Sequence, residues 1–211
     1  MMKNYIDQMI ERYPTLASVR SEINAAVDML AALGDGRILL CGNGGSAADC
    51  EHIAGELLKG FLSHRTPTGE EFSRLSEAIG AERAGRLQRG IAAIPLVSVS
   101  GALSAFANDV DPELVFAQLV YAIGRHGDVL VCLSTSGNSA NVVAAASVAR
   151  SLGIKTVALT GEGGGKLGGI CDITIAVPER ETFKVQEYHL PVYHAICAEL
   201  ERRLFCIGDV L

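Results

Sequence analysis

Residues 128–139 read Asp-Val-Leu-Val-Cys-Leu-Ser-Thr-Ser-Gly-Asn-Ser and join a short apolar run to a polar loop that contains a glycine. The apolar run has no polar alternation, which is typical of a strand covered on both faces of a parallel sheet. Residues 139–152 then follow with helical spacing. A strand, a polar loop and a helix in succession form the repeating unit of a doubly wound α/β sheet.

The same pattern extends in both directions from this stretch. Five apolar runs predict strands, at residues 37–41, 93–99, 128–133, 155–159 and 172–177. Helical stretches separate most of them, notably at residues 46–62, 112–124 and 139–152. The first 33 residues predict a helical pair broken near Pro14, and residues 187–205 predict a long amphipathic helix. We therefore expect one α/β domain over residues 1–211, with a five-stranded parallel sheet flanked by helices.

Residues 62–90 fit this alternation less well. They begin with a polar and charged stretch and continue as a weakly helical one, through Phe72, Leu75 and Ile79. We interpret this segment as a polar insertion that forms a surface lobe, with a structural rather than a chemical role.

The bulk composition limits the class of partner and the compartment. A net charge of −6 argues against a nucleic-acid surface, which needs a basic face. No apolar run approaches the ~20 residues that span a bilayer, and residues 1–7 lack the apolar region of a secretory signal. The six cysteines form no C-x-x-C pair, and Cys41 and Cys132 lie in apolar runs. We expect buried thiols, a cytoplasmic protein and no membrane partner.

Three polar loops follow predicted strands, at residues 41–46, 134–139 and 160–165. Ligands of open parallel sheets bind at the carboxyl ends of the strands, where these loops lie. The 134–139 loop, which we call the serine loop, has four hydroxyls in six residues before a helix whose first N–H groups carry positive partial charge. It predicts a phosphate site; the alternative is that Ser139 only caps its helix.

The other two loops resemble nucleotide-binding motifs but match neither. Residues 42–47 lack the third glycine of the dinucleotide fingerprint, and no acidic residue ends the second predicted strand. Residues 161–166 are one residue short of a P-loop, and Leu167 stands where Ser or Thr is required.

Groups for proton transfer or metal binding occur on two predicted helices. His52 and Glu56 are four residues apart and therefore share one helix face. The last helix contains Gln186, His189 and His194. A His-x-x-x-Glu pair is common on helix surfaces, so this pair alone is weak evidence for a site.

Two further features have a structural and a functional interpretation. Cys50 precedes His52 by two residues, and packing explains it better than ligation does. Asn108 and Asp109, after a predicted turn at residues 100–102, form either a polar lip of the site or the end of a helix.

The polar motifs, taken in order, resemble those of the sugar isomerase (SIS) family. They read Gly-Asn-Gly-Gly-Ser, His-x-x-x-Glu, Ala-Asn-Asp, Ser-Thr-Ser-Gly-Asn-Ser-Ala-Asn, Leu-Thr-Gly and Gln-Glu-x-His-x(4)-His. Within that family the pattern is most similar to the phosphoheptose isomerases, which interconvert sedoheptulose 7-phosphate and D-glycero-D-manno-heptose 7-phosphate. The resemblance covers nearly the whole chain apart from residues 62–90, and it implies the SIS fold.

The resemblance also implies roles for the matched residues. Glu56 would be the base and His194 the acid of an aldose–ketose isomerisation through an enediolate. Some members bind zinc, and one ion per subunit would here have the ligands His52, Glu56, Gln186 and His194. The family is typically homotetrameric, with sites near subunit boundaries. The residues expected to contact the phosphosugar are Asn43, Gly44, Gly45, Ser46, Asn108, Asp109, Ser134, Thr135, Ser136, Ser139 and Gln186.

Elementary chemistry agrees with these roles. Isomerisation needs a carboxylate that moves a proton next to a carbonyl, and a second group that moves protons between oxygens. A cation or hydrogen-bond donor must stabilise the enediolate, and His52, Gln186 or a metal could supply it.

Departures from the family pattern concern the substrate more than the fold. Lys59-Gly60 stands where the family usually has an arginine, and Pro191 removes a helical hydrogen bond between Gln186 and His194. On an ideal helix Gln186 and His194 point roughly 80° apart. Two alternatives therefore stay open. One is an isomerase of another phosphosugar, and the other is a non-catalytic module that binds a phosphosugar or a protein.

Overall fold

The computed structural model describes residues 4–205, so the ends of the predicted domain, at residues 1–3 and 206–211, lie outside it. Within that range five strands form one parallel sheet in the order β2-β1-β3-β4-β5. The strands are β1 (Ile38–Gly42), β2 (Ala93–Pro95), β3 (Val129–Leu133), β4 (Lys155–Thr160) and β5 (Ile173–Ala176). The predicted doubly wound parallel sheet is confirmed, and each predicted strand overlaps an observed one.

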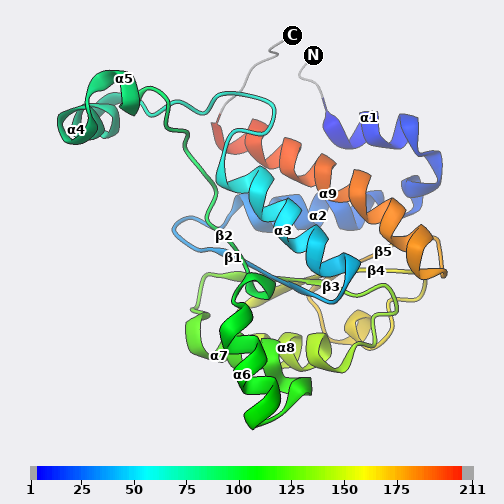
Figure 1. Ribbon diagram of the computed structural model, residues 1–211. Coiled ribbons are helices and arrows are strands. Elements are labelled where there is room, and N and C mark those ends of the chain that lie inside the picture. Colours follow the sequence, from blue (N-terminus) through cyan, green and yellow to red (C-terminus); the bar gives the residue numbers. More distant parts are fainter. Residues whose placement is uncertain (1–3, 206–211) are drawn as a thin grey trace.

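Helices cover both faces of the sheet (Figure 1). One face carries α1 (Tyr5–Arg12), η1 (Pro14–Val19), α2 (Arg20–Ala31), α3 (Gly45–Leu58) and α9 (Thr182–Phe205). The other carries α6 (Ser100–Asp109), η3 (Pro112–Leu114), α7 (Val115–Ile123) and α8 (Ala140–Ser151). Alternate residues of a strand enter opposite cores: Val131 packs with the first set of helices and Cys132 with the second. This two-sided burial explains the uninterrupted apolar runs.

Parts of the fold differ from the predicted elements. β2 is shorter than residues 93–99, because Pro95 has no N–H for the ladder and the chain turns into η2 (Leu96–Ser98). Residues 100–109 form α6, where the sequence indicated a turn at 100–102, since the alanines that follow Gly101 favour a helix. A further short helix, η4 (Leu167–Gly169), precedes β5.

The last helix, α9, begins at Thr182 rather than at residue 187 and continues through Pro191 without a break. The buried neighbours Val192 and Tyr193 hold this part of the helix against the core. In residues 4–205 no helix, α9 included, is long and apolar enough to cross a membrane.

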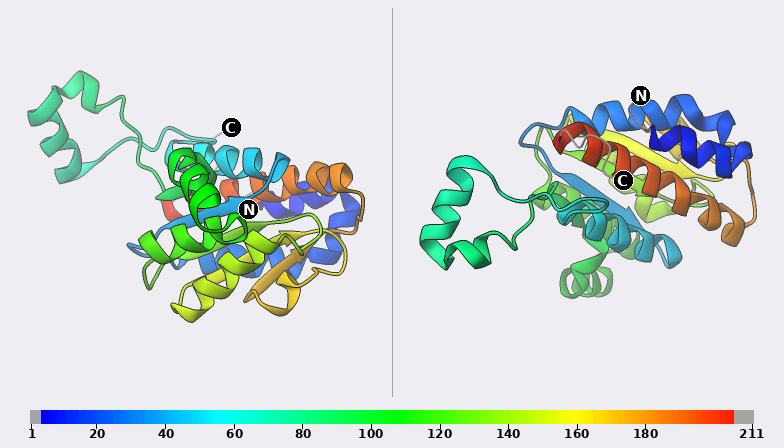
Figure 2. Two further views of the ribbon diagram at one scale, coloured as in Figure 1. Left: turned by 60° about the horizontal axis from the view of Figure 1, so that its bottom comes forward. Right: turned by 90° about the horizontal axis from the view of Figure 1, so that it is seen from above.

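The insertion at residues 62–90 projects from the layered body as an arm (Figures 1 and 2). Its tip consists of α4 (Gly69–Ile79) and α5 (Ala81–Ala84), and α4 contains no buried residue. The first and last segments of the insertion, residues 62–66 and 88–90, lie side by side and form its stem. There the N–H of Arg89 donates to the carbonyl oxygen of Arg65 at 2.6 Å. The predicted surface lobe is therefore confirmed as a feature of the fold.

Candidate active site

The serine loop lies at the carboxyl end of β3, directly before α8. Ser134 is buried, and its Oγ lies 3.0 Å from the Oγ of Ser139. Ser139 occupies the N-cap position of α8, yet its hydroxyl makes no capping hydrogen bond. The capping explanation for Ser139 is therefore wrong, because its hydroxyl faces Ser134. Thr135 is half-buried, and Ser136 is exposed and accepts a hydrogen bond from the N–H of Asn138 at 3.2 Å.

The third loop, at residues 160–165, packs against the backbone of the serine loop. The N–H of Gly161 donates to the carbonyl oxygen of Thr135 at 2.9 Å. Gly137 has φ +65°, and a Cβ there would lie 2.1 Å from the carbonyl oxygen of Gly164. Only glycine allows this approach of two backbones. The glycine-rich run that fails as a P-loop thus packs against the serine loop.

The first loop lies next to the serine loop, because the two loops follow the neighbouring strands β1 and β3. Gly44 stands at the N-cap of α3, with φ +55°, and Ser46 is buried in the first turn. The side-chain amides of Asn43 and Asn141 exchange two hydrogen bonds, each 2.9 Å long. Because β1 and β3 are adjacent, the N-termini of α3 and α8 lie close together. An anion between them would face two helix N-termini and the surrounding hydroxyls.

Asn108 and Asp109 lie apart from these loops in the sequence, at the exposed end of α6. The side-chain amide of Asn108 donates to the carboxylate of Asp109 at 2.8 Å. The pair therefore ends a helix, as one interpretation expected, and a role in contacting the sugar stays a prediction.

The remaining predicted residues lie where α3 packs against α9. Gly45, Asp49, His52 and Glu56 recur at intervals of four, three and four residues and so form one stripe along α3. A Cβ on Gly45 would lie 2.6 Å from Nε2 of Gln186, so the Gln186 amide covers the start of this stripe. Further along α3, His52 contacts His194, which is eight residues after Gln186 on α9. The two helices thus run parallel, with Gln186 near the loops and His194 further away.

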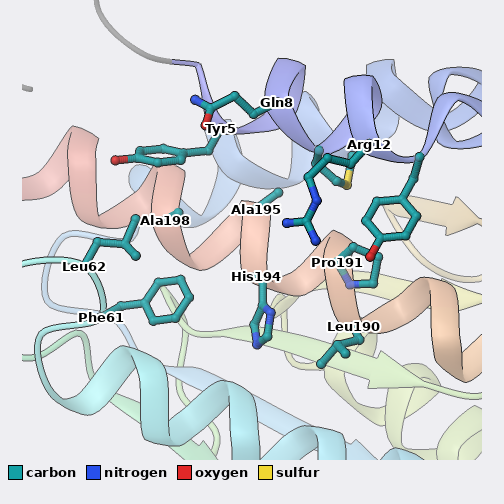
Figure 3. Close-up of a pocket in the computed structure, with 12 residues that line it drawn as sticks. Tyr5, Gln8, Arg12, Phe61, Leu62, Leu190, Pro191, His194, Ala195 and Ala198 are labelled. Atoms are coloured by element: carbon teal, nitrogen blue, oxygen red, sulfur yellow. The ribbon is translucent and has the colours of Figure 1, made fainter. Parts of the chain in front are cut away.

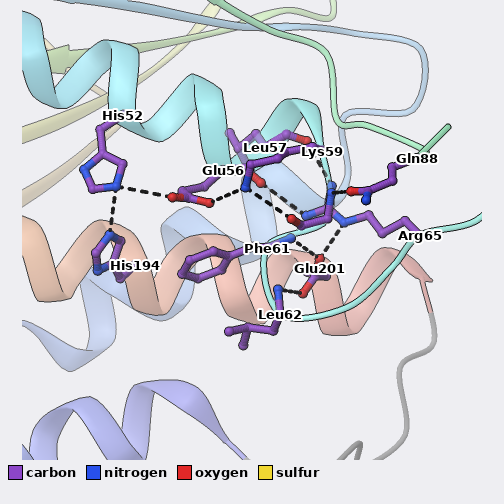
Figure 4. A network of polar contacts seen from close by, with 11 residues as sticks. His52, Glu56, Leu57, Lys59, Phe61, Leu62, Arg65, Gln88, His194 and Glu201 are labelled. Carbon is purple, nitrogen blue, oxygen red and sulfur yellow. Dashed lines mark hydrogen bonds and ion pairs between the residues drawn. The ribbon is translucent and has the colours of Figure 1, made fainter. Parts of the chain in front are cut away.

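His52, Glu56 and His194 form one contact network (Figure 4). Nε2 of His52 lies 3.3 Å from Oε1 of Glu56 and 3.4 Å from Nε2 of His194. Nζ of Lys59 donates to the other carboxylate oxygen of Glu56 at 3.0 Å. The structure therefore brings the predicted base and acid to the same imidazole.

Burial sets the protonation state of His194. It lowers the pKa of His194 below its usual 6.5, and the neighbouring His52 lowers it further, while Glu56 acts in the opposite direction. A neutral imidazole at neutral pH can both donate and accept a proton, as an isomerase needs.

A cavity of about 360 Å³ lies between α1 and α9 and exposes one side of His194 (Figure 3). The ring of Phe61, at the base of the insertion, lies 5.6 Å from the imidazole of His194. The other lining residues are Tyr5, Gln8, Met9, Arg12, Tyr13, Leu62, Leu190, Pro191, Ala195 and Ala198. The cavity is therefore mostly apolar, and the serine loop does not line it.

The distance between the loops and the network follows from helix geometry. Glu56 is ten residues after Ser46 on α3, which places it about 15 Å further along the axis. Side chains on a helix lean toward its N-terminus, which shortens the gap.

Comparison with known proteins identifies the family. The family model of the SIS domain matches residues 4–93 and 77–161. The chain belongs to the SIS domain family. A phosphoheptose isomerase of Akkermansia muciniphila is 36% identical over 208 residues, which is 97% of each chain. One from Aliarcobacter butzleri is 40% identical over 168 residues, 80% of this chain and 77% of its own.

A solved structure gives the same result for this SIS chain. The structure of phosphoheptose isomerase GmhA from Neisseria gonorrhoeae superposes with a TM-score of 0.68 at 31% identity, and the match covers 92% of this chain and 98% of that one. The predictions of an SIS fold and of an enzyme similar to the phosphoheptose isomerases are confirmed.

The metal site expected of some SIS proteins is only partly assembled in this chain. Two imidazoles and a carboxylate, those of His52, His194 and Glu56, are ligands that zinc accepts. Within residues 4–205, however, no group of three or more His, Cys, Asp or Glu side chains has an arrangement that could hold a metal ion. Gln186 lies against Gly45, near the other end of the stripe. In this arrangement the four expected ligands are not gathered around one point, so the mechanism below is derived without a metal ion.

Sequence reasoning missed two side chains of this SIS site, Asp49 and Tyr193, and noted Lys59 only as the residue that stands where the family usually has an arginine. The Tyr193 hydroxyl lies 2.9 Å from Nδ1 of His52 and donates to Asp49 at 3.2 Å. Asp49 could have been found, because it shares the stripe of His52 and Glu56. Tyr193 had no signal, since an aromatic residue beside a histidine in a helix is usually part of a core.

Proposed function

We propose that this chain is an aldose–ketose isomerase that interconverts sedoheptulose 7-phosphate and D-glycero-D-manno-heptose 7-phosphate through an enediolate. One observation carries the proposal. Helix α3 begins at the first loop, next to the serine loop at the ends of β1 and β3, and carries Glu56 further along, where Glu56 lies beside His52 and where His194 of α9 contacts His52. A phosphosugar isomerase requires an anion anchor and a proton-transfer pair held at a fixed separation, and α3 connects the anchor to the base.

The anchor would be built from backbone and hydroxyl groups. The N-termini of α3 and α8, with Ser46, Ser134, Thr135, Ser136 and Ser139, would hold the phosphate. Asn43, Gly44, Gly45, Asn108, Asp109 and Gln186 would contact the sugar chain. Such a site needs no basic cluster, so a phosphate ligand is compatible with the net charge of −6.

The reaction would proceed by proton transfers that Glu56 and His194 carry out. Glu56 removes a proton from C1 of the ketose, and the electron pair moves to the C2 carbonyl oxygen to give the enediolate. His194 then moves a proton between the oxygens on C1 and C2. Glu56 returns its proton to C2, which leaves the aldose carbonyl at C1. The ammonium group of Lys59 lies beside the base and adds positive charge where the enediolate forms.

The test is interconversion of sedoheptulose 7-phosphate followed by NMR, with the native chain and with Glu56→Gln. Loss of a general base costs about 10²- to 10⁴-fold in rate, so the variant should lose that much of kcat. Glu51→Gln is the matched control, because Glu51 is exposed on the same helix and accepts a hydrogen bond from the hydroxyl of Ser98, away from His52 and Glu56. Full activity of Glu56→Gln would remove Glu56 from the mechanism. No turnover by the native chain, with or without zinc, would refute the function.

A second candidate is an isomerase of another phosphosugar. Phe61 and Leu62, at the base of the insertion, line the cavity beside His194, and Lys59 contacts Glu56, so the surroundings of the proposed proton-transfer groups include residues of this region. A panel of phosphosugars, followed by solvent-proton exchange at the carbon next to the carbonyl, would separate the two candidates. Failure of every phosphosugar to bind would instead favour a non-catalytic interaction module.

Zinc and the compartment are further parts of the proposal. A zinc ion held by His52, Glu56, Gln186 and His194 would require Gln186 to leave Gly45 and extend along α9 toward His194. Metal analysis of the purified protein should then find one zinc per chain, and His52→Ala should lose it. We also expect the enzyme to act in the cytoplasm, where the five free thiols among residues 4–205 stay reduced.

A further inference from the structure

Asn141, in the first turn of α8, has no role in the function proposed above, although its side chain contacts Asn43 of the first loop. Nδ2 of Asn43 donates to Oδ1 of Asn141 at 2.9 Å, and Nδ2 of Asn141 donates to Oδ1 of Asn43 at the same distance. The two residues are 98 positions apart in the sequence. Their amides form a closed pair, which we call the amide clasp, between the loops that follow β1 and β3.

The backbone of α8 fixes the orientation of the amide clasp. The N–H of Val142 donates to Oδ1 of Asn141 at 3.0 Å. A backbone N–H needs an acceptor, so the oxygen of the Asn141 amide, and not its NH₂ group, occupies this position. The NH₂ group of Asn141 then faces the oxygen of Asn43. The helix thus orients Asn141, and the clasp in turn orients Asn43.

The amide clasp lies where a ligand of this fold is expected and leaves Asn43 able to bind it. In open parallel sheets, ligands bind at the point where the chain continues to opposite sides of the first strand. The strand order β2-β1-β3 places this point between β1 and β3. Asn43 is exposed there, and the clasp uses one of its two N–H groups and one of the two lone pairs of its oxygen. By this count one N–H and one lone pair remain for a ligand.

We propose that Asn141 is a positioning residue that holds the amide of Asn43 in one orientation, so that its remaining N–H and lone pair bind hydroxyl groups of the substrate. The relevance to the substrate rests on the proposed isomerase function, whereas the clasp itself does not. An exposed amide without a partner moves among several rotamers and loses that freedom when it binds a ligand. The clasp removes this freedom beforehand, so Asn141 acts through Asn43 rather than on the sugar.

The decisive variant is Asn141→Ala, which removes the amide clasp and leaves Asn43 in place. Alanine favours the helix, so the fold should be kept. Ordering a free side chain on binding costs about 2- to 12-fold in a binding constant. The apparent Kd of sedoheptulose 7-phosphate, measured by titration calorimetry, should rise by that factor. Asn24→Ala is the matched control and should bind as the native chain does, because Asn24 is also a half-buried asparagine on a helix and donates to Arg20 of that helix.

A double-mutant cycle separates positioning from direct contact. In the Asn43→Ala background, Asn141→Ala should have no further effect on the Kd of the sugar phosphate, because it acts through Asn43. Inorganic phosphate, which the serine loop would hold, should bind Asn141→Ala as tightly as it binds the native chain. In turnover, KM should rise in Asn141→Ala with kcat nearly unchanged, as expected for a contact made equally with the substrate and the transition state.

Three results would overturn the positioning role of Asn141. They are an unchanged Kd in Asn141→Ala, the full effect of Asn141→Ala in the Asn43→Ala background, and tighter binding by Asn141→Ala, which would show that the clasp blocks the site. If the native chain binds no sugar phosphate, the proposed function and the positioning role both fail. NMR then decides whether the clasp exists, because the NH₂ protons of Asn43 should exchange with water more slowly in the native chain than in Asn141→Ala.

Discussion

His189, at the residue scale, shows how burial separates one histidine of α9 from another. Its side chain is completely buried, and Nε2 lies 3.3 Å from the carbonyl oxygen of Thr160. Nδ1 is buried without a hydrogen-bond partner in the described part of the chain. Burial lowers the pKa of His189 from 6.5 to about 4. His189 is therefore a neutral structural group, whereas His194, five residues later, reaches a cavity.

This burial predicts a loss of stability in acid. The unfolded chain binds a proton at His189 below about pH 6.5, and the folded chain only below about pH 4. Above pH 6.5 His189 is neutral in both states and does not lower the stability. As the pH falls from 6.5 to 4, only the unfolded chain gains this proton, and the free energy of unfolding decreases by about 3 kcal/mol in total. Urea titrations at pH 7 and 4.5 should show a smaller pH dependence for His189→Gln than for the native chain. His126→Gln, at an exposed position, should behave as the native chain does, and equal behaviour of the two variants would contradict the prediction.

The insertion is the clearest case at the element scale, because its stem is fixed while its tip packs mainly on itself. The Arg65 and Glu201 side chains are 0% and 1% exposed and form an ion pair of 2.6 Å. The Glu201 carboxylate also accepts the N–H groups of Phe61 and Leu62 at 2.8 and 2.7 Å. Arg65 donates to the carbonyl oxygen of Leu57 at 2.9 Å, at the end of α3. This pair ties the stem to both α9 and α3 (Figure 4).

Removing one partner of this pair should destabilise the whole chain. Glu201→Ala leaves the Arg65 charge buried without its carboxylate, which costs about 3–5 kcal/mol. For a chain of this size that lowers Tm by roughly 6–20 °C, measurable by calorimetry. Replacing residues 68–86 with a short Gly-Ser linker is the control. It removes α4, which has no buried residue, and should shift Tm by much less. Equal shifts would show that the tip contributes as much to stability as the stem.

At the scale of the whole molecule, the SIS relationship leads us to propose a homotetramer. The cavity beside His194 is open between α1 and α9 and is lined mostly by apolar side chains. Light scattering should give a mass about four times that of one chain. If the sites lie near subunit boundaries, the specific activity should fall on dilution together with the mass. A monomer with undiminished activity would refute this assembly.

Local chemistry was sufficient to predict much of this protein. The apolar runs predicted each strand found in residues 4–205, because a strand covered on both faces is a short, uninterrupted run of apolar residues. The serine loop was also predictable, since its hydroxyls, glycine and following helix are contiguous. The pairing of Ser139 with Ser134 instead of a cap required the structure.

Tertiary structure alone decided which side chains contact those of α9. Tyr193 meets His52 across 141 residues of sequence, and Arg65 meets Glu201 across 136. The spacing of Gln186 and His194 predicted the angle between their side chains on an ideal helix. Their contacts, however, depend on how α9 packs along α3. That packing follows from the burial of whole helix faces in a common core. The sequence by itself thus determined the sheet and the anion loops, and only the packing of two distant helices determined which side chains surround His52.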